Sequence, residues 1–125
     1  MKKLKILVLD CNPIIHIGLK SIFKNSMIFE VCAYLDAKNL LIETIGEEKI
    51  DLIISEIDLN GSSAQDILRI LKKNKIDIPV VIFTSLSNEI KSLKLLKKGA
   101  SGFLTKNLKK KTIRHILQEI AFSRY

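Results

Sequence analysis

Short apolar segments alternate along this chain with longer segments in which apolar residues recur every three or four positions. The short segments predict strands at residues 5–9, 28–34, 51–55, 80–83 and 102–104. Most of them are continuously apolar rather than alternating, which indicates strands covered by helices on both faces. Strands that alternate with helices pair in parallel. The sequence therefore predicts an α/β fold, a doubly wound five-stranded parallel sheet between two layers of helices.

Capping residues predict where the first three helices begin and end. Asn12 followed by Pro13 is typical of a helix start, because asparagine caps the first turn and proline fits the first helical position. A second helix is expected to be capped by Asp36 and to end at Gly46, in the left-handed conformation that glycine adopts readily. Ser63, with Asp66 three residues later, predicts the start of a third through a relative of the capping box.

The last two helices are predicted from the spacing of their apolar residues. One opens at residues 87–88 and closes at Gly99, with Ile90, Leu93 and Leu96 facing inward. The other spans about residues 109–123 and places its apolar residues on one side. These are Ile113, Ile116, Leu117 and Ile120.

The net charge of +8 is concentrated in the last third of the chain. Residues 1–84 carry 11 Lys and Arg against 11 Asp and Glu, whereas residues 85–125 carry 10 against 2. This basic region is either a solvated face of a lysine-rich protein or a surface that binds nucleic acid or another polyanion. The residues that would form such a surface are Lys91, Lys94, Lys97, Lys98, Lys109, Lys110, Lys111 and Arg114.

The hydrophobic content of 47% predicts a folded core, yet no apolar run approaches the roughly 18 residues of a membrane span. The first apolar run, residues 6–9, ends at Asp10 and is too short for a signal peptide. We therefore expect a cytoplasmic protein with no membrane partner. Cys11 and Cys32 are then expected to be reduced thiols rather than a disulfide or a zinc site.

In doubly wound sheets ligands bind beyond the carboxyl ends of the strands, where the strand order reverses. Polar residues that follow the predicted strands are therefore the first candidates for a functional site. They are Asp10, Cys11, Glu56, Thr84, Ser85 and Lys106.

Four of these strand ends carry a recognisable pattern, in the segments 5–13 (KILVLDCNP), 51–61 (DLIISEIDLNG), 79–85 (PVVIFTS) and 98–106 (KGASGFLTK). Together they resemble response-regulator receiver domains. Asn12-Pro13 followed by Gly18-Leu19 looks most like receivers of the LuxR/NarL type, which precede a helix-turn-helix domain. The resemblance implies a flavodoxin-like (βα)5 receiver fold over residues 1–125. It also implies a helix-turn-helix output domain beyond Tyr125, where the linker would begin.

In receivers an acidic pair and a strand-end aspartate, which is the phosphoacceptor, hold Mg²⁺. The resemblance places Asp10, the backbone carbonyl of Asp58 and Glu56 in these positions. Two positions depart from the family pattern. Cys11 replaces the second acid with a soft ligand that suits Mg²⁺ poorly, and Glu56 replaces the aspartate with a longer side chain. We therefore expect Mg²⁺ binding to be weak or lost and phosphotransfer to be badly impaired.

The resemblance further assigns a phosphate pocket to Thr84, Ser85 and Lys106, and an aromatic switch position to Phe103. The extra length of Glu56 is expected to direct its charge toward Lys106 and Thr84, partly imitating a phosphorylated aspartate. For each of these residues a plainer role stays open: Thr84 and Phe103 as packed core, and Lys106 as a surface lysine.

These features predict an atypical receiver, phosphorylation-independent or weakly phosphorylatable, that acts in signal transduction and transcription regulation through protein contacts. Its partners would be its own output domain or another protein, and a second copy through the first and last helices or through the fourth and fifth. The family's usual donor, a sensor histidine kinase, is the partner that the changes at Cys11 and Glu56 put in question. Direct nucleic-acid or polyanion binding is the alternative. No enzyme is expected, because the chain has no P-loop, GxGxxG or flavin phosphate loop.

Overall fold

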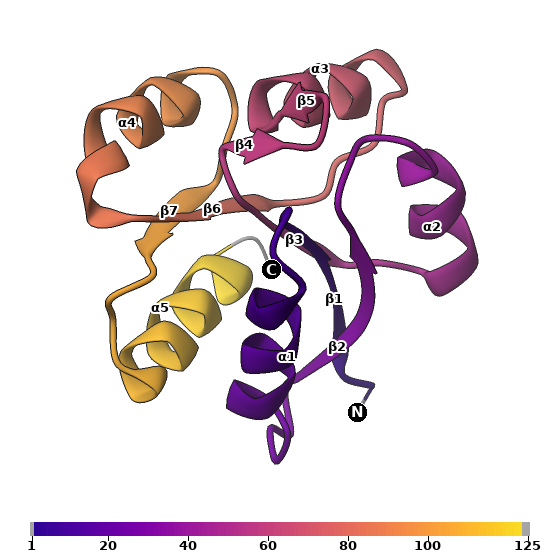
Figure 1. The fold of residues 1–125 in the computed structure, drawn as a ribbon. Helices are drawn as coiled ribbons and strands as arrows, with labels where there is room; N and C mark the ends of the chain where they lie inside the picture. The colour runs from indigo at the N-terminus through magenta and orange to yellow at the C-terminus, as the bar shows by residue number, and fades with distance from the viewer. Residues whose placement is uncertain (1, 124–125) are drawn as a thin grey trace.

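A computed structural model describes residues 2–123 as an open sheet between two layers of helices (Figure 1). Its elements run β1 (Leu4–Leu9), α1 (Pro13–Ile22), β2 (Phe29–Leu35), α2 (Leu41–Glu48), β3 (Leu52–Ser55), β4 (Asp58–Leu59), β5 (Ser62–Ser63), α3 (Ala64–Lys73), β6 (Val80–Thr84), the 3-10 helix η1 (Leu86–Asn88), α4 (Glu89–Lys97), β7 (Gly102–Thr105) and α5 (Lys110–Phe122).

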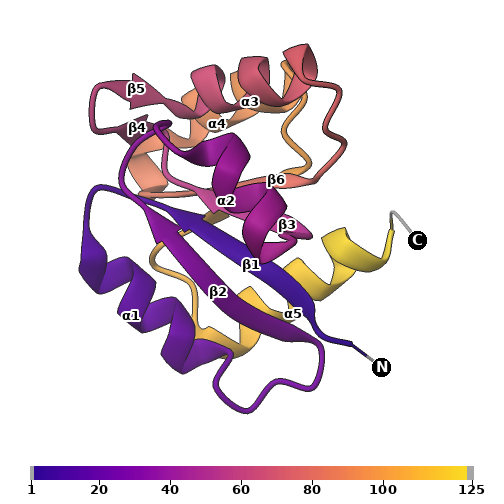
Figure 2. The ribbon, with the colours of Figure 1, turned by 90° about the vertical axis from the view of Figure 1, so that its right-hand side faces the viewer.

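The main sheet has the strand order β2-β1-β3-β6-β7, and every neighbouring pair is parallel. The predicted doubly wound five-stranded sheet is therefore confirmed. Helices α1 and α5 cover one face, and α2, α3 and α4 cover the other (Figures 1 and 2). Strand order reverses between β1 and β3, so the carboxyl ends of these two central strands mark the expected ligand position.

Each face of the sheet packs its own hydrophobic cluster. On the α2–α3–α4 side, Leu7 and Ile53 from the sheet meet Leu41, Ile67 and Leu95 from the helices. On the α1–α5 side, the strands pack against apolar residues of those two helices, Leu19, Ile113, Leu117 and Ala121. Within the part of the chain that the structure describes, no helix is both long and apolar enough to cross a membrane.

The predicted start of α3 is confirmed. Asn60 and Gly61 form the turn of the small β4–β5 hairpin, with Gly61 in the left-handed region at φ 72°. Ser63 then caps α3, because its hydroxyl accepts a hydrogen bond from the Asp66 amide while the Asp66 carboxylate accepts one from the Ser63 amide at 2.9 Å. This reciprocal pair is a complete capping box.

The predicted ends of α2 are wrong. Leu40, at φ 66°, precedes the helix, and no side chain caps it; the Asp36 carbonyl instead accepts a hydrogen bond from the Asn60 amide at 2.9 Å. Gly46 lies inside the helix, and the left-handed residue that ends it is Lys49 at φ 55°. The helix continues past Gly46 because the buried Ile50 closes it, donating its amide to the Ile45 carbonyl at 3.1 Å. Burial of the apolar side chains overrode the local glycine signal.

The predicted inner face of α4 is also wrong in part. Ile90 and Leu93 are exposed, at 71% and 46% of their surface, and only Leu96 packs partly against the core. The side chains that α4 buries are Ser92 and Leu95. Leu96 lies three residues after Leu93 and four after Ser92, so it fits both sets of residues. The packing selected the set that includes Ser92 and Leu95. As a result, α4 presents apolar side chains to solvent.

Substitutions of Gly46 and Gly99 test this placement. Gly46→Ala should stabilise the fold by about 0.5–1 kcal/mol, because the glycine is helical and a methyl group there meets no atom within 4 Å. Gly99→Ala should destabilise it by about 1 kcal/mol or more, since Gly99 has φ 114°. Urea unfolding would measure both. Destabilisation by Gly46→Ala would instead support the helix end that the sequence predicted.

Candidate functional site

The sheet brings four of the predicted residues to one edge. Asp10 follows β1, Glu56 follows β3, Thr84 ends β6 and Lys106 follows β7. Hydrogen bonds of the sheet fix their backbones, because the Glu56 amide donates to the Leu9 carbonyl at 2.9 Å and the Lys106 amide donates to the Thr84 carbonyl at 2.8 Å. Because the strands are parallel, residues that are far apart in the sequence lie together at the carboxyl ends of the strands and form one site.

The centre of this site is the Lys106 bridge, in which one ammonium group holds two carboxylates. Lys106 Nζ donates to Asp10 Oδ2 and to Glu56 Oε1, both at 2.9 Å. Asp10 is only 3% exposed, and a carboxylate removed from water in this way is stabilised by a close cation. The Phe83 ring, whose centroid lies 5.9 Å from Nζ, adds an aromatic face beside the ammonium. The bridge joins the ends of β1, β3 and β7.

The remaining carboxylate oxygens are satisfied by backbone amides. Asp10 Oδ1 accepts from the Asn12 amide at 2.9 Å, and Glu56 Oε2 accepts from the Ile57 amide. Every oxygen of the two carboxylates therefore has a donor. Since a buried carboxylate without partners is costly, this network fixes both side chains in place.

The Lys106 ammonium is held in its charged form. Partial burial lowers its pKa, but the hydrogen bonds and charges of Asp10 and Glu56 outweigh that effect, and the pKa is raised above its ordinary value of 10.5. The two carboxylates therefore face a permanent positive charge throughout the neutral pH range.

The potential metal ligands do not fit Mg²⁺ in this arrangement. Asp10 Oδ2 and Glu56 Oε1 hold the Lys106 ammonium, and the Asp58 carbonyl lies 3.8 Å from Cys11 Sγ, which is placed to donate to it. Burial and the neighbouring carboxylates, Asp10 among them, raise the pKa of the Cys11 thiol, so it stays protonated. Among residues 2–123, no three His, Cys, Asp or Glu side chains are placed to hold a metal ion together. Mg²⁺ needs several oxygens free at once.

The other residues assigned by the resemblance lie near the bridge without joining it. Thr84 is 1% exposed, and its hydroxyl accepts a hydrogen bond from the Asn88 amide side chain at 2.9 Å. Ser85 is exposed, and its hydroxyl lies 3.0 Å from that of Ser87. Phe103 is partly buried against the α2–α3–α4 cluster. Glu56 therefore reaches Lys106 but has no hydrogen bond to Thr84.

Two residues that contact the site, Tyr34 and Asn88, could not be identified as site residues from the strand-end pattern. The Tyr34 hydroxyl donates to the Asp10 carbonyl at 2.6 Å, and the Tyr34 ring stacks on His16 with centroids 5.0 Å apart. Tyr34 pairs with Val8 across β1 and β2, so its nearness to Asp10 follows once the register is known. Asn88 was expected only to open α4. It does immediately precede α4, but its side chain donates to the Thr84 hydroxyl rather than capping the helix.

Asp10, Glu56 and Lys106 lie together at the carboxyl ends of the strands of this doubly wound sheet. Such a fold with two carboxylates and a lysine at this position is that of a receiver-type signalling domain. The sequence profile described as "Response regulator receiver domain" matches residues 6–118. The chain therefore belongs to the response regulator receiver domain family, whose members act in two-component signalling rather than as enzymes. This confirms the predicted family and the prediction that the chain is not an enzyme.

Individual relatives agree with this assignment. The chain is 25% identical over 120 residues to the Fimbriae Z protein of Escherichia coli (strain K12), covering 96% of this chain and 57% of that protein. It is 28% identical over 119 residues to the nitrate/nitrite response regulator protein homolog of Haemophilus influenzae, covering 95% and 57%. The chain thus spans little more than half the length of the curated relatives it matches.

Solved structures share the fold. The signal receiver domain of the putative response regulator NarL from Mycobacterium tuberculosis matches with a TM-score of 0.85 at 18% identity, over 97% of this chain and 98% of that one. A LuxR-family two-component response regulator from Aurantimonas sp. SI85-9A1 matches with a TM-score of 0.85 at 20% identity, over 98% and 87%. The predicted receiver fold is confirmed.

Substitution of the bridging lysine tests how much it contributes to the free energy of unfolding. Lys106→Met should destabilise the domain by about 2 kcal/mol, because it leaves two adjacent carboxylates without their shared cation. The matched control is Lys38→Met, at an exposed lysine, which should change stability by less than about 0.5 kcal/mol. Equal stability of the two variants in urea unfolding would show that the bridge contributes nothing.

The raised pKa of Lys106 predicts how the bridge depends on pH. A cation whose folded-state pKa is raised stabilises the fold fully below its unfolded-state pKa, near 10.5, and the contribution is lost as pH rises through the folded-state value. The difference in unfolding free energy between the wild type and Lys106→Met should therefore be constant from about pH 7 to about pH 9 and shrink above it. A difference that grows with alkaline pH would contradict this assignment.

Proposed function

We propose that this domain is an atypical receiver that regulates an output domain or partner protein through protein contacts. In this proposal the Lys106 bridge, rather than phosphorylation, fixes the conformation of the domain. The observation that carries the proposal is the pairing of Lys106 with both Asp10 and Glu56 at 2.9 Å. The proposed conformation is permanent, because the charges that hold it belong to side chains of the protein and are not added by a kinase.

The geometry at Glu56 supports impaired phosphorylation. Nucleophilic attack requires a carboxylate oxygen that is free and in line with the incoming phosphoryl group. Both Glu56 oxygens instead accept hydrogen bonds, from Lys106 and from the Ile57 amide. The extra methylene also moves the carboxylate beyond the reach of an aspartate, and a misplacement of about 1 Å can reduce a rate by about 10²-fold.

The same contacts support a partial imitation of the phosphorylated state. The longer Glu56 side chain reaches Lys106, which the resemblance makes a phosphate ligand. It does not reach Thr84, whose hydroxyl is engaged by Asn88. We therefore infer that Glu56 makes only one of the two contacts expected of a phosphoryl group, the contact to Lys106, and not the contact to Thr84. We also infer that Phe103 stays in its partly buried position, because no phosphorylation moves it.

The relatives support a place in transcription regulation, because one of them is the transcriptional regulatory protein YdfI of Bacillus subtilis, 20% identical over 113 residues that cover 90% of this chain and 53% of that protein. This chain matches little more than half of each, and the match to full-length FixJ of B. japonicum, with a TM-score of 0.83 at 20% identity, likewise covers 58% of that chain. We infer that the domain acts on an output region joined to its carboxyl end, in the manner that receivers contact output domains.

Restoration of the two missing acids tests the proposal. The double variant Cys11→Asp/Glu56→Asp should form a phosphorylated adduct with acetyl phosphate and Mg²⁺, visible as a mass increase of the intact protein, whereas the wild type should form none. Glu56→Asp alone should react more slowly than the double variant, because it lacks one anionic metal ligand.

Two results would contradict the proposal. An adduct on the wild-type protein at the rate of the double variant would show that Glu56 is still an acceptor. No adduct on the correctly folded double variant would show that this site is not an altered phosphorylation pocket. Circular dichroism of each variant controls for folding.

A further inference from the structure

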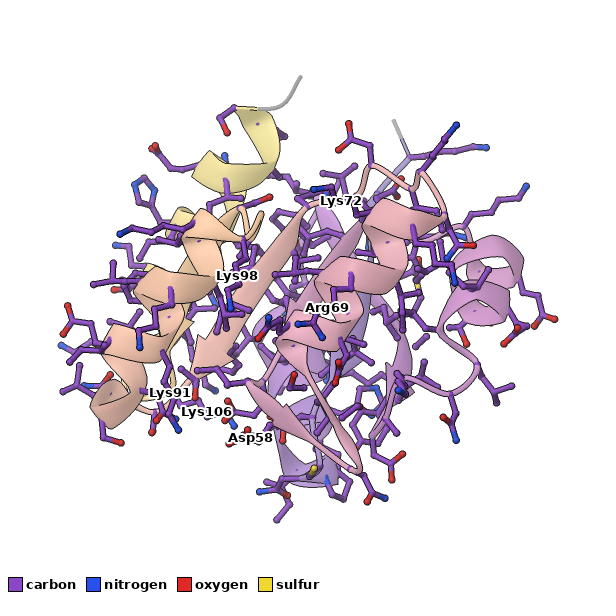
Figure 3. The ribbon with its side chains drawn as sticks, turned by 90° about the horizontal axis from the view of Figure 1, so that it is seen from above. Asp58, Arg69, Lys72, Lys91, Lys98 and Lys106 are labelled. Atoms are coloured by element: carbon purple, nitrogen blue, oxygen red, sulfur yellow. The ribbon has the colours of Figure 1, made fainter. Side chains whose placement is uncertain are left out.

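A groove runs along the surface between α3 and α4, starting beside the segment that follows β3 and contains Glu56, Ile57 and Asp58, which we call the acceptor loop. Three adjoining hollows of about 260, 320 and 600 Å³ form it, and Lys98 lines all three. Figure 3 shows Arg69 and Lys72 on α3, Lys91 on α4, Lys98 just after the end of α4, and Asp58 near the end where Lys106 lies. We name this surface the α3–α4 groove; three adjoining hollows of these volumes suit a chain segment rather than a single ion.

The walls of the α3–α4 groove are strongly basic. Its only described carboxylates are Asp58 at one end and Asp77 at the other. Against these stand seven cations, and none of the six lysines among them forms an ion pair within residues 2–123. The seven are Arg69, Lys72, Lys75, Lys91, Lys94, Lys97 and Lys98. Unpaired cations converging on one hollow create a local positive potential that attracts an anionic partner.

The floor of the α3–α4 groove is apolar. Leu68, Ile76 and Ile78 line it and are only partly buried, so apolar surface is open between the two rows of cations. Leu95 and Ile57 continue this floor toward the acceptor loop. None of the described residues lining the three hollows is aromatic. A ligand that fills the groove therefore needs apolar side chains as well as negative charge.

This combination separates the groove from the other basic cluster of the chain. Lys109, Lys110 and Lys111, at the start of α5, are exposed and line none of the three hollows. Three of the seven groove cations, Arg69, Lys72 and Lys75, come from α3 or its end, outside the basic last third on which the sequence analysis relied. The groove thus depends on packing between two helices, not on a run of lysines.

We propose that the α3–α4 groove binds an acidic, leucine-containing peptide segment of a partner protein. Its carboxylates pair with the two rows of cations, and its apolar side chains cover Leu68, Ile76 and Ile78. A nucleic acid fits less well, because its bases find no aromatic platform and its phosphates meet Asp58 and Asp77 at the ends of the groove. The inference goes beyond the proposed function, since it does not depend on whether Glu56 is phosphorylated.

Fluorescence anisotropy with defined probes tests this proposal on the full chain. The main probe is a fluorescein-labelled peptide of about ten residues that alternates glutamate with leucine. A second peptide has serine in place of each leucine, and a third probe is a duplex DNA of about 20 base pairs. The groove variant is Lys91→Gln/Lys94→Gln/Lys98→Gln. The control, Lys109→Gln/Lys110→Gln/Lys111→Gln, removes the same charge outside the groove.

The glutamate–leucine peptide should bind most tightly, with affinity that falls as salt rises. The groove variant should lose about tenfold in affinity for it and the control less than about twofold. Equal losses in the two variants, tighter binding of the serine peptide or of DNA, or no binding of any probe would overturn the proposal. Circular dichroism confirms that both variants keep the wild-type fold. Because neither variant alters Glu56 or Cys11, the result is independent of the phosphodonor experiment.

Discussion

One ammonium group between two carboxylates holds together the carboxyl ends of three strands of this sheet. Lys106 joins the end of β7 to the ends of β1 and β3, and the backbone amides of Asn12 and Ile57 complete the set of donors around Asp10 and Glu56. Receivers use this edge for a metal and a phosphoryl group, both brought from outside. We propose that in this chain the charges of Lys106 and Glu56, which lie 2.9 Å apart, take the place of those two groups.

Local and periodic patterns sufficed for the fold. Continuous apolar strands and the capping box at Ser63 each have a short-range physical cause, so the sheet, the order of the elements and the start of α3 could be predicted. The patterns failed where tertiary packing chose between local options. In α2 the burial of Ile50 outweighed the signal at Gly46, and in α4 the side chains of Ser92 and Leu95 were buried in place of Ile90 and Leu93.

The candidate site could be located from the sequence because strand ends in a parallel sheet share one edge. Its internal contacts could not. Whether Glu56 meets Lys106 or Thr84 depends on rotamers and on Asn88, which competes for the Thr84 hydroxyl. The role of Tyr34 depends on the register of β2 against β1, which a single sequence does not specify. The same holds for the α3–α4 groove, whose cations come from two helices separated by a strand.

We propose that the Lys106 bridge occupies the place of the metal ion and the phosphoryl group. A heteronuclear NMR titration of the wild-type protein with Mg²⁺ and then beryllofluoride, following the amides of Asp10, Glu56, Thr84 and Lys106, tests it most directly. If the bridge occupies this place, we expect no saturable chemical-shift change at these amides, because the side chains of the four residues already have hydrogen-bond partners. Saturable shifts at all four that spread to Phe103 would show a site that still accepts a metal and a phosphoryl mimic, and would contradict the account.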